Sequence, residues 1–293
     1  MISGSIVALV TPMHEDGGVD YELLQRLVKW HLEEGTDAIV SVGTTGESAT
    51  LAEEEHCEVI RRTIEFADGR IPIIAGTGAN ATSEALQLTR RAAEMGADAA
   101  LLVTPYYNKP TQEGLYRHYM TIADAVGIPQ ILYNVPGRTA VDMAVETTAR
   151  LAGHENIVGL KEAADDSAER VAPLRQLCGA AFALYSGNDD SGRRFVLNGG
   201  NGVISVTANI APRQMQRMIA AALAGDEEGS RQLDLPLRLL HQRLFIQSSP
   251  IPVKWALAQM GLINKGIRLP LTWLHSQYHE DLMEAMREAG VLQ

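Results

Sequence analysis

The chain has 293 residues, of which 46% are hydrophobic and 21% are charged, a balance typical of a folded protein with a large core. This composition excludes a disordered chain and a small disulfide-stapled domain. The 25 Lys and Arg residues are outnumbered by 36 Asp and Glu residues, so the formal net charge is −11. We therefore expect no general affinity for nucleic acid or for an acidic membrane surface.

The amino-terminal segment and the cysteines indicate the compartment. Residues 1–12 contain no basic segment, and their apolar run is too short for a secretion signal. No later stretch reaches the roughly 18 apolar residues of a membrane span. Cys57 and Cys178 lack the spacing of a zinc ribbon, so two reduced thiols are expected. These features predict a cytoplasmic protein.

Eight short apolar runs recur along the chain, with room for a helix after each one. They are too continuously apolar to have one face in water, which is typical of parallel strands covered on both sides. The runs comprise residues 5–10, 38–42, 72–76, 99–104, 130–135, 157–161, 182–187 and 202–206.

The intervening segments have helical patterns and helix-start signals. Thr50 and Glu53 resemble a capping box, Thr82 begins a second pattern, and Gly96 is a suitable C-cap for it. Eight such units predict an α/β protein, a closed (β/α)8 or TIM barrel, over residues 1–224, followed by a C-terminal helical region over residues 225–293. An open, doubly wound sheet is the alternative, because the number of strands is uncertain from sequence.

In a barrel of this kind the chemistry lies where the strands end, and one lysine stands at such a position. Lys161 ends the apolar run 157–161, so its side chain is expected at the C-terminal mouth of the barrel. A free lysine has a pKa of about 10.4, and burial favours the neutral amine, which is the nucleophile in imine formation. The alternative is a structural ion pair with Glu162 or another acid. The other lysines are Lys29 in a helical pattern, Lys109 in a loop, Lys254 near the start of a C-terminal helix and Lys265 in a turn.

Imine formation also requires a group that moves protons. Tyr133 ends the neighbouring run and is well placed for this role, with Thr44 as a hydroxyl relay to solvent. The alternative for Tyr133 is a packed aromatic residue whose hydroxyl forms a hydrogen bond at the rim.

Two further segments are suited to carboxylates. The Gly43–Gly46 turn offers backbone N–H groups and the hydroxyls of Thr44 and Thr45, but it lacks the ending of a nucleotide-binding P-loop. Arg138 has the forked geometry that binds a second carboxylate. A simple tight turn and an ordinary surface ion pair are the respective alternatives.

Metal and nucleotide cofactors are not indicated. The eight histidines are scattered, without paired ligand spacing at a strand end. Neither a Gly-x-Ser-x-Gly elbow nor a Gly-x-Gly-x-x-Gly fingerprint is present. The residues by themselves therefore predict a site of the aldolase type without metal or cofactor, in which a lysine imine acts on an oxo acid.

Five ordered motifs resemble the dihydrodipicolinate synthase (4-hydroxy-tetrahydrodipicolinate synthase) family of class I aldolases, and the likeness continues through Trp255. They are residues 43–47, 105–110, 133–138, 159–161 and 202–207. The resemblance implies that pyruvate forms an imine with Lys161 and tautomerises to an enamine, which attacks the aldehyde of L-aspartate 4-semialdehyde. Cyclisation and release then open the diaminopimelate route to lysine.

The same resemblance assigns the remaining site residues and a homotetramer, a dimer of tight dimers. Tyr133 would donate and accept protons, with Thr44 and Tyr107 as its relay, and Tyr107 would come from the neighbouring subunit of the tight dimer. Pyruvate would be held by Thr45 and by the backbone at Ile204. The carboxylate of the semialdehyde would be bound by Arg138.

Two alternatives to this activity are considered. N-acetylneuraminate lyase and sugar-acid aldolases share the glycine-rich turn and the imine lysine, but Arg138 and the pair Tyr106 and Tyr107 resemble the synthases. An inactive barrel that only binds an oxo acid would need neither Lys161 nor Tyr133.

Some family members are inhibited by L-lysine at the tight-dimer interface. The matching positions here are Ala49, His56, Asn80, Glu84 and Tyr106. Position 53 is Glu53, where some inhibited relatives carry histidine, and the added negative charge would either attract the lysine ammonium or disturb the pocket. Inhibition by lysine is therefore a hypothesis.

Overall fold

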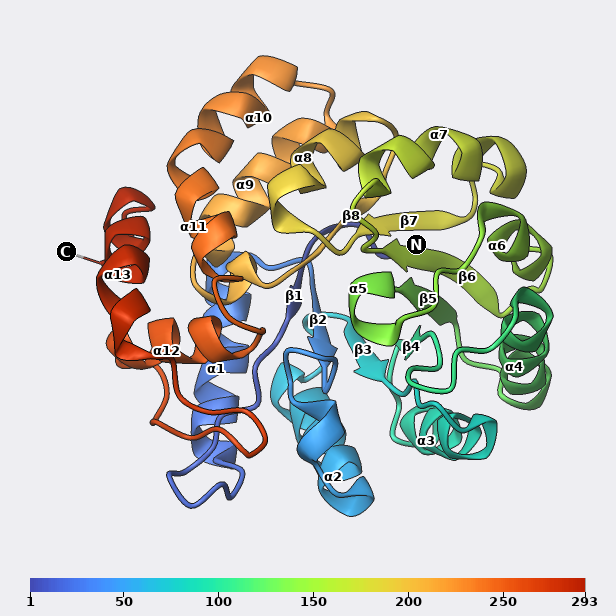
Figure 1. Ribbon diagram of the computed structural model, residues 1–293, viewed down its shortest axis with the longest axis horizontal. Coiled ribbons are helices and arrows are strands. Elements are labelled where there is room, and N and C mark those ends of the chain that lie inside the picture. The colour runs from blue at the N-terminus through green and yellow to red at the C-terminus, as the bar shows by residue number, and fades with distance from the viewer. Residues whose placement is uncertain (293) are drawn as a thin grey trace.

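Eight parallel strands close into a barrel in chain order, and β8 is hydrogen-bonded to β1. The structure is a computed structural model, which describes residues 1–292 (Figure 1). The predicted (β/α)8 barrel is thus confirmed, and the open sheet is excluded. The strands are β1 (Gly4–Ala8), β2 (Ala38–Ser41), β3 (Ile73–Gly76), β4 (Ala99–Val103), β5 (Gln130–Asn134), β6 (Ile157–Glu162), β7 (Ala183–Ser186) and β8 (Gly202–Ser205).

Helices follow each strand and form the outer ring. Local signals set several of their ends: the Asp20 side chain accepts the N–H of Leu23 at the start of α1, and Gly35 ends that helix with a φ of 80°. The ring comprises α1 (Tyr21–Glu34), α2 (Glu53–Ala67), α3 (Thr82–Glu94), α4 (Gln112–Ala125), α5 (Pro136–Thr139), α6 (Val145–Leu151), α7 (Ser167–Cys178), α8 (Asp189–Leu197) and α9 (Pro212–Leu223). Short 3-10 turns are η1 (Ser48–Thr50) and η2 (Thr207–Asn209).

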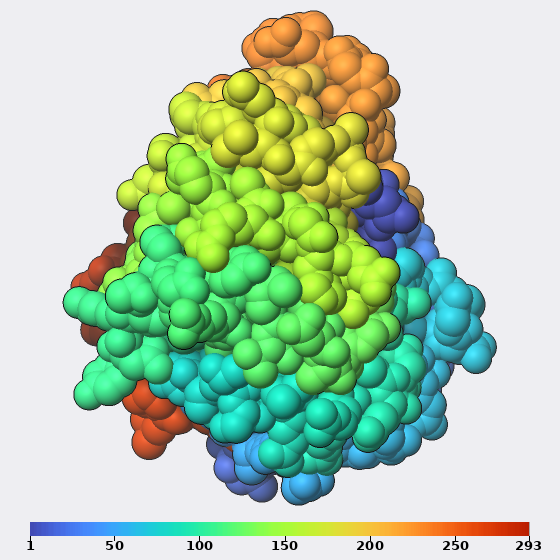
Figure 2. Space-filling model, turned by 90° about the vertical axis from the view of Figure 1, so that its right-hand side faces the viewer, coloured from blue at the N-terminus to red at the C-terminus, as the bar shows by residue number. Residues whose placement is uncertain are grey.

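Successive residues of each strand face the barrel interior and the surrounding helices in turn. In β5, Ile131 and Tyr133 belong to the inner cluster, whereas Leu132 packs in the outer cluster with α4 and α7. Figure 2 shows the outer face formed by the teal to yellow-green segments that carry α3, α4, α6 and α7. This alternation decides which strand-end residues reach the mouth and which reach the helices.

The C-terminal region is helical, as expected, and shares a core with the barrel. Met13 and Val206 lie in the same buried cluster as Leu240, Trp255 and Met286. The division at residue 224 remains a prediction. No helix within residues 1–292 is long and apolar enough to cross a membrane. The region consists of α10 (Glu227–Asp234), η3 (Leu235–Leu237), α11 (Arg238–Arg243), α12 (Ile251–Gln259), η4 (Ser276–Tyr278) and α13 (His279–Glu288).

One predicted helix start is wrong. Helix α2 begins at Glu53, its N-cap is Ala52, and the hydroxyl of Thr50 instead donates to the carbonyl of Glu47 within the turn η1. The start of α3 at Thr82 is confirmed, and Gly96 lies just past its end with a φ of 87°.

Candidate active site

Lys161 and Tyr133 lie side by side at the inner mouth of the barrel. They are register partners on β6 and β5, and both side chains point inward. The Nζ atom of Lys161 lies 4.2 Å from the centre of the Tyr133 ring, and the two residues are only 6% and 7% exposed. Gly187 makes room for this arrangement, because a Cβ there would lie 3.0 Å from Cε of Lys161. An amine and a phenol are thus held together away from bulk water.

A cavity of about 80 Å³ opens over this pair. It brings together five residues predicted from sequence, and they come from three different strand ends. They are Thr44, Thr45, Tyr133, Arg138 and Lys161. Its size fits a molecule of a few heavy atoms, such as a small oxo acid.

The turn after β2 presents the two threonines. Val42 and Glu47, at its ends, have positive φ values of 55° and 59°, and the N–H of Glu47 donates to the carbonyl of Thr44 over 3.1 Å. A buried ion pair holds Glu47: its carboxylate contacts Nζ of Lys254 and accepts the backbone N–H of Arg268. The turn therefore depends on the C-terminal region, and Lys254 is a buried partner of the site.

Arg138 lies on the short helix α5, directly after β5. Its Nη2 atom donates to the carbonyl of Ser249 over 3.2 Å, and the side chain lines both the cavity and a larger neighbouring one. The guanidinium thus stands at the rim, where a carboxylate of a second substrate would arrive.

Two predicted residues do not line the cavity. Ile204 is fully buried in β8 within the inner cluster, and Val206, two residues later, lines the wall instead. Tyr107 is 89% exposed, has a φ of 74°, and lies in the loop after β4. Their assigned roles remain predictions.

A second cavity, of about 270 Å³, adjoins the first and shares Thr44 and Arg138 with it. It brings together most of the positions at which the resemblance places a regulatory lysine. Those that line it are Ala49, Glu53, His56, Glu84 and Tyr106. Asn80 does not line this cavity, although its carbonyl accepts the side-chain amide of Asn108.

Glu53 and His56 are already engaged in this second cavity. The carboxylate of Glu53 accepts from Gln87 and from Arg91, both on α3. The Nε2 atom of His56 lies 2.7 Å from the carbonyl of Gly76, and burial lowers the pKa of this imidazole. The negative charge introduced at position 53 is therefore balanced by Arg91.

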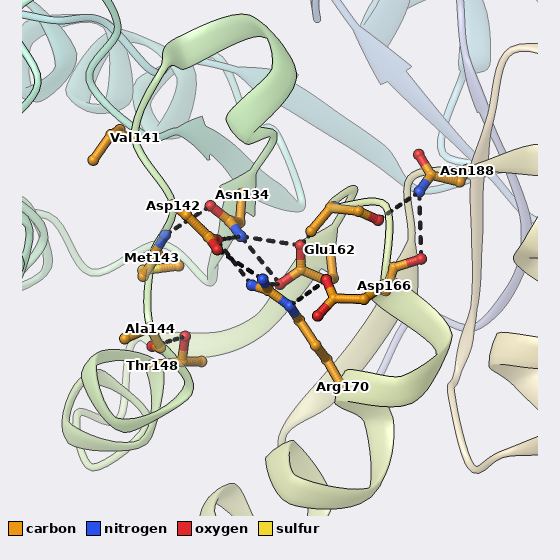
Figure 3. Close-up of polar contacts among 12 residues, drawn as sticks. Asn134, Val141, Asp142, Met143, Ala144, Thr148, Glu162, Asp166, Arg170 and Asn188 are labelled. Atoms are coloured by element: carbon orange, nitrogen blue, oxygen red, sulfur yellow. Dashed lines mark hydrogen bonds and ion pairs between the residues drawn. The ribbon is translucent and has the colours of Figure 1, made fainter.

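Behind Lys161 and Tyr133, on the outer face of the same strands, lies a polar cluster (Figure 3). The side-chain amide of Asn134 donates to Asp142 over 2.7 Å and to both oxygens of Glu162 over 3.0 and 3.2 Å. Arg170 forms two hydrogen bonds with Asp142 and lies 3.5 Å from Glu162. Burial raises the pKa of Glu162 to about 7, opposed by the N–H of Ala164, by Arg170 and by Asn134. The alternative in which Lys161 pairs with Glu162 is wrong, because the two side chains lie on opposite faces of β6.

Several residues of the site were missed from sequence. Asn188 lies two residues after the end of β7, so the strand-end rule indicates it as it does the others. Phe245 and Ser249 reach the cavity from the segment between α11 and α12, which has no strand pattern and gives no such signal. Within residues 1–292, no group of three or more His, Cys, Asp or Glu side chains is placed to hold a metal ion.

Comparisons with known proteins agree with this geometry. The model of the dihydrodipicolinate synthetase family matches residues 1–289. The 4-hydroxy-tetrahydrodipicolinate synthase of Methylococcus capsulatus is 64% identical over 292 residues, covering 100% of both chains. The crystal structure of a chloride-inhibited dihydrodipicolinate synthase from Acinetobacter baumannii, complexed with pyruvate, is 57% identical, with a TM-score of 0.98 over 100% of both chains. The synthase from Cyanidioschyzon merolae with lysine bound is 40% identical, with a TM-score of 0.95 over 99% of both chains. The chain therefore belongs to the dihydrodipicolinate synthetase family.

Proposed function

We infer that this protein is a lyase that condenses pyruvate with L-aspartate 4-semialdehyde to give 4-hydroxy-tetrahydrodipicolinate. The observation that carries this conclusion is the buried amine of Lys161, held beside the Tyr133 phenol in a small cavity with two threonine hydroxyls. Pyruvate is a partner in the crystal structure of the Acinetobacter relative, whose chain matches this one over its full length. In this proposal the protein acts in the cytoplasm, and the reaction opens the diaminopimelate route to lysine.

Lys161 carries the covalent step in this proposal. Its neutral amine adds to the keto carbon of pyruvate, and loss of water gives the imine. Loss of a methyl proton gives the enamine, whose carbon forms a bond with the aldehyde carbon of the semialdehyde. The amino group of the semialdehyde then attacks the imine carbon and displaces the amine of Lys161, which releases the cyclic product and regenerates the enzyme.

Tyr133 moves the protons for these steps. Its phenol donates to the departing hydroxyl of the carbinolamine and accepts a proton when the imine becomes an enamine. Thr44 lines both cavities and is positioned to connect the phenol with solvent. Tyr107 completes this relay from a neighbouring subunit, consistent with its exposed position in the single chain.

Different residues bind the two substrates in this proposal. Thr45 and the backbone at Ile204 hold the carboxylate of pyruvate. Arg138, at the rim, binds the carboxylate of the semialdehyde through its forked guanidinium.

The activity test uses the purified protein with pyruvate and L-aspartate 4-semialdehyde, followed by mass spectrometry of the product. We expect the cyclic condensation product, and no pyruvate from N-acetylneuraminate supplied instead. Release of pyruvate from N-acetylneuraminate, without condensation product, would assign the chain to the lyases of the superfamily.

Regulation by L-lysine and a homotetrameric assembly are further parts of this proposal. The second cavity is lined by Glu84, whose carboxylate suits an ammonium, and a relative has been solved with lysine bound. Isothermal titration with millimolar L-lysine should release or absorb heat that is lost in Glu84→Gln. Sedimentation should give four times the mass of one chain. A flat titration would remove the inhibitor, and a stable monomer would remove the assembly.

A further inference from the structure

The strand ends that carry the catalytic pair are joined on their outer face by a second pair of side chains. Tyr133 faces Lys161 inside the barrel, and the next residues in register, Asn134 and Glu162, face each other outside it. Both outer residues are at most 1% exposed. Asn134 and Glu162 each lie one peptide unit from Tyr133 and Lys161, respectively. A change in the distance between Asn134 and Glu162 therefore also moves the phenol and the amine.

The same pair fixes the chain on either side of the strand ends. Oε1 of Glu162 accepts the N–H of Ala164 over 2.8 Å, which turns the chain immediately after β6. Oδ1 of Asn134 accepts the N–H of Met143 over 2.9 Å, while its amide nitrogen donates to Asp142. Residues 135–141, including the helix α5, form a loop whose two ends are thus held together by Asn134 (Figure 3).

That loop carries Arg138, so the cluster also fixes the position of a third residue of the site. Arg170, from α7, closes the cluster from outside through its paired hydrogen bonds to Asp142 and a further bond to Asp166. Every donor and acceptor described here is matched by another group of the cluster. A fully satisfied buried network of this kind holds its members in one arrangement.

We propose that Glu162, acting through Asn134, is a positioning residue that sets the geometry of Lys161, Tyr133 and Arg138. It touches no substrate, because it lies behind the barrel wall. Glu162 supplies a hydrogen-bond acceptor within reach of Asn134 and Ala164. Both the carboxylate and the neutral acid accept hydrogen bonds from the N–H groups of these two residues. The proposal rests on the proposed function, since it concerns the same amine and phenol.

Two conservative variants separate the position of the oxygen from its charge. Glu162→Gln keeps an acceptor at nearly the same place and loses the charge. Glu162→Asp keeps the charge but withdraws the oxygens by about one bond length, on the order of 1.5 Å, out of reach of Asn134. If position matters, the glutamine variant retains function and the aspartate variant does not.

The measurement is the rate at which pyruvate is trapped on Lys161 by borohydride, together with kcat and KM for both substrates. We expect Glu162→Asp to form the adduct at least about tenfold more slowly than wild type, and its kcat to fall by a similar factor. Small misplacements of reacting groups greatly reduce reaction rates. The KM of Glu162→Asp for pyruvate should stay within about threefold of wild type, since Thr45 is held by another part of the chain. Glu162→Gln should trap pyruvate and turn over at rates within about threefold of wild type. The matched control is Glu169→Gln, which removes an exposed ion pair between α7 and α8 and should leave all rates unchanged.

Each outcome decides something. Glu162→Asp trapping pyruvate at the wild-type rate would overturn the positioning role while leaving the proposed function intact. A slow Glu162→Gln beside a Glu162→Asp of wild-type rate would assign the effect to charge, and equal losses in both variants would show that an acceptor at the same place does not suffice. Either result would also overturn the positioning role. A wild-type protein that traps no pyruvate would overturn the proposed function, and with it the positioning role. Thermal melting of each variant checks that the rates refer to folded protein.

Discussion

The chain buries two lysines at the barrel, and their neighbours give them different chemistry. Lys254 is fully buried, which lowers its pKa, and the carboxylate of Glu47 in contact with its Nζ atom opposes this shift by stabilising the charged form. Lys161 instead lies over the ring of Tyr133 and opens onto a cavity. A lysine held by a carboxylate is a structural cation, whereas a lysine facing a cavity is available as a nucleophile.

The phenol of Tyr133 is tested by Tyr133→Phe. The ring that packs against Lys161 remains, but the proton donor is lost, so kcat should fall by about 100-fold or more. Steady-state kinetics with both substrates measures this, and circular dichroism provides the control for folding. Turnover within about threefold of wild type would remove Tyr133 from the proton-transfer role.

The raised pKa of Glu162 makes the free energy of unfolding depend on pH. Burial raises its pKa from 4.5 in a free side chain to about 7, opposed by Ala164, Arg170 and Asn134 and assisted by Asp142. The folded state therefore binds the proton more tightly than the unfolded state. The contribution of Glu162 to the free energy of unfolding is present in full below pH 4.5. It is lost as the pH rises towards 7, by an amount on the order of 3 kcal/mol.

Glu162→Gln removes this titration. We expect the difference in unfolding free energy between variant and wild type to shift in favour of the variant between pH 4.5 and 7. Urea denaturation at a series of pH values measures it. A difference that stays constant over this range would contradict the raised pKa.

At the level of elements, the turn after β2 is held by a helix that follows it by some two hundred residues. Glu47 takes a left-handed conformation, and its carboxylate is fixed by Lys254 on α12 and by the backbone of Arg268. The hydroxyl of Thr45, which holds pyruvate in the proposed function, lies on this turn. The C-terminal helices thus complete the site by holding the turn in shape.

Lys254→Met tests this connection. Removing one partner leaves the Glu47 carboxylate buried and unbalanced, so the unfolding free energy should fall by about 3–5 kcal/mol, and KM for pyruvate should rise. The double variant Glu47→Gln with Lys254→Met should recover most of the stability. A loss below about 1 kcal/mol in the single variant would show that the pair is not needed.

The elements themselves were largely predictable. All eight strands were located from sequence because a strand buried on both faces must be continuously apolar. The start of α2 was misplaced because Thr50 bonds the carbonyl of Glu47, whose conformation depends on Lys254. A capping signal is local, but what its side chain contacts was decided here by a distant helix.

At the level of the whole molecule, one proposed relay residue lies away from the cavity of its own chain. Tyr107 is almost fully exposed, whereas the other proposed relay group, Thr44, lines the cavity. If Tyr107 acts in catalysis, a second subunit must bring it to the site.

Mixing two inactive variants tests this arrangement. Tyr107→Phe and Lys161→Ala should each be strongly impaired as pure proteins. Half of randomly reassociated dimers are hybrids, and each hybrid has one intact site, so an equimolar mixture should regain about a quarter of wild-type activity. A mixture no more active than the mean of its parents would place Tyr107 outside the neighbouring site.

The site was predictable only in part. Lys161, Tyr133, Thr44 and Arg138 were found because each lies at the end of a strand or in the loop after it, and strand ends meet at one mouth. Phe245, Ser249 and Lys254 were missed because their approach depends on how the C-terminal helices fold back over the barrel. That packing is a property of the complete core and leaves no local pattern.

The imine on Lys161 is the central claim, and borohydride reduction in the presence of pyruvate tests it most directly. The account predicts a reduced pyruvate adduct on the peptide that contains Lys161, detected by mass spectrometry and absent in Lys161→Ala. A folded wild-type protein that acquires no adduct, or acquires it on another lysine, would contradict the mechanism.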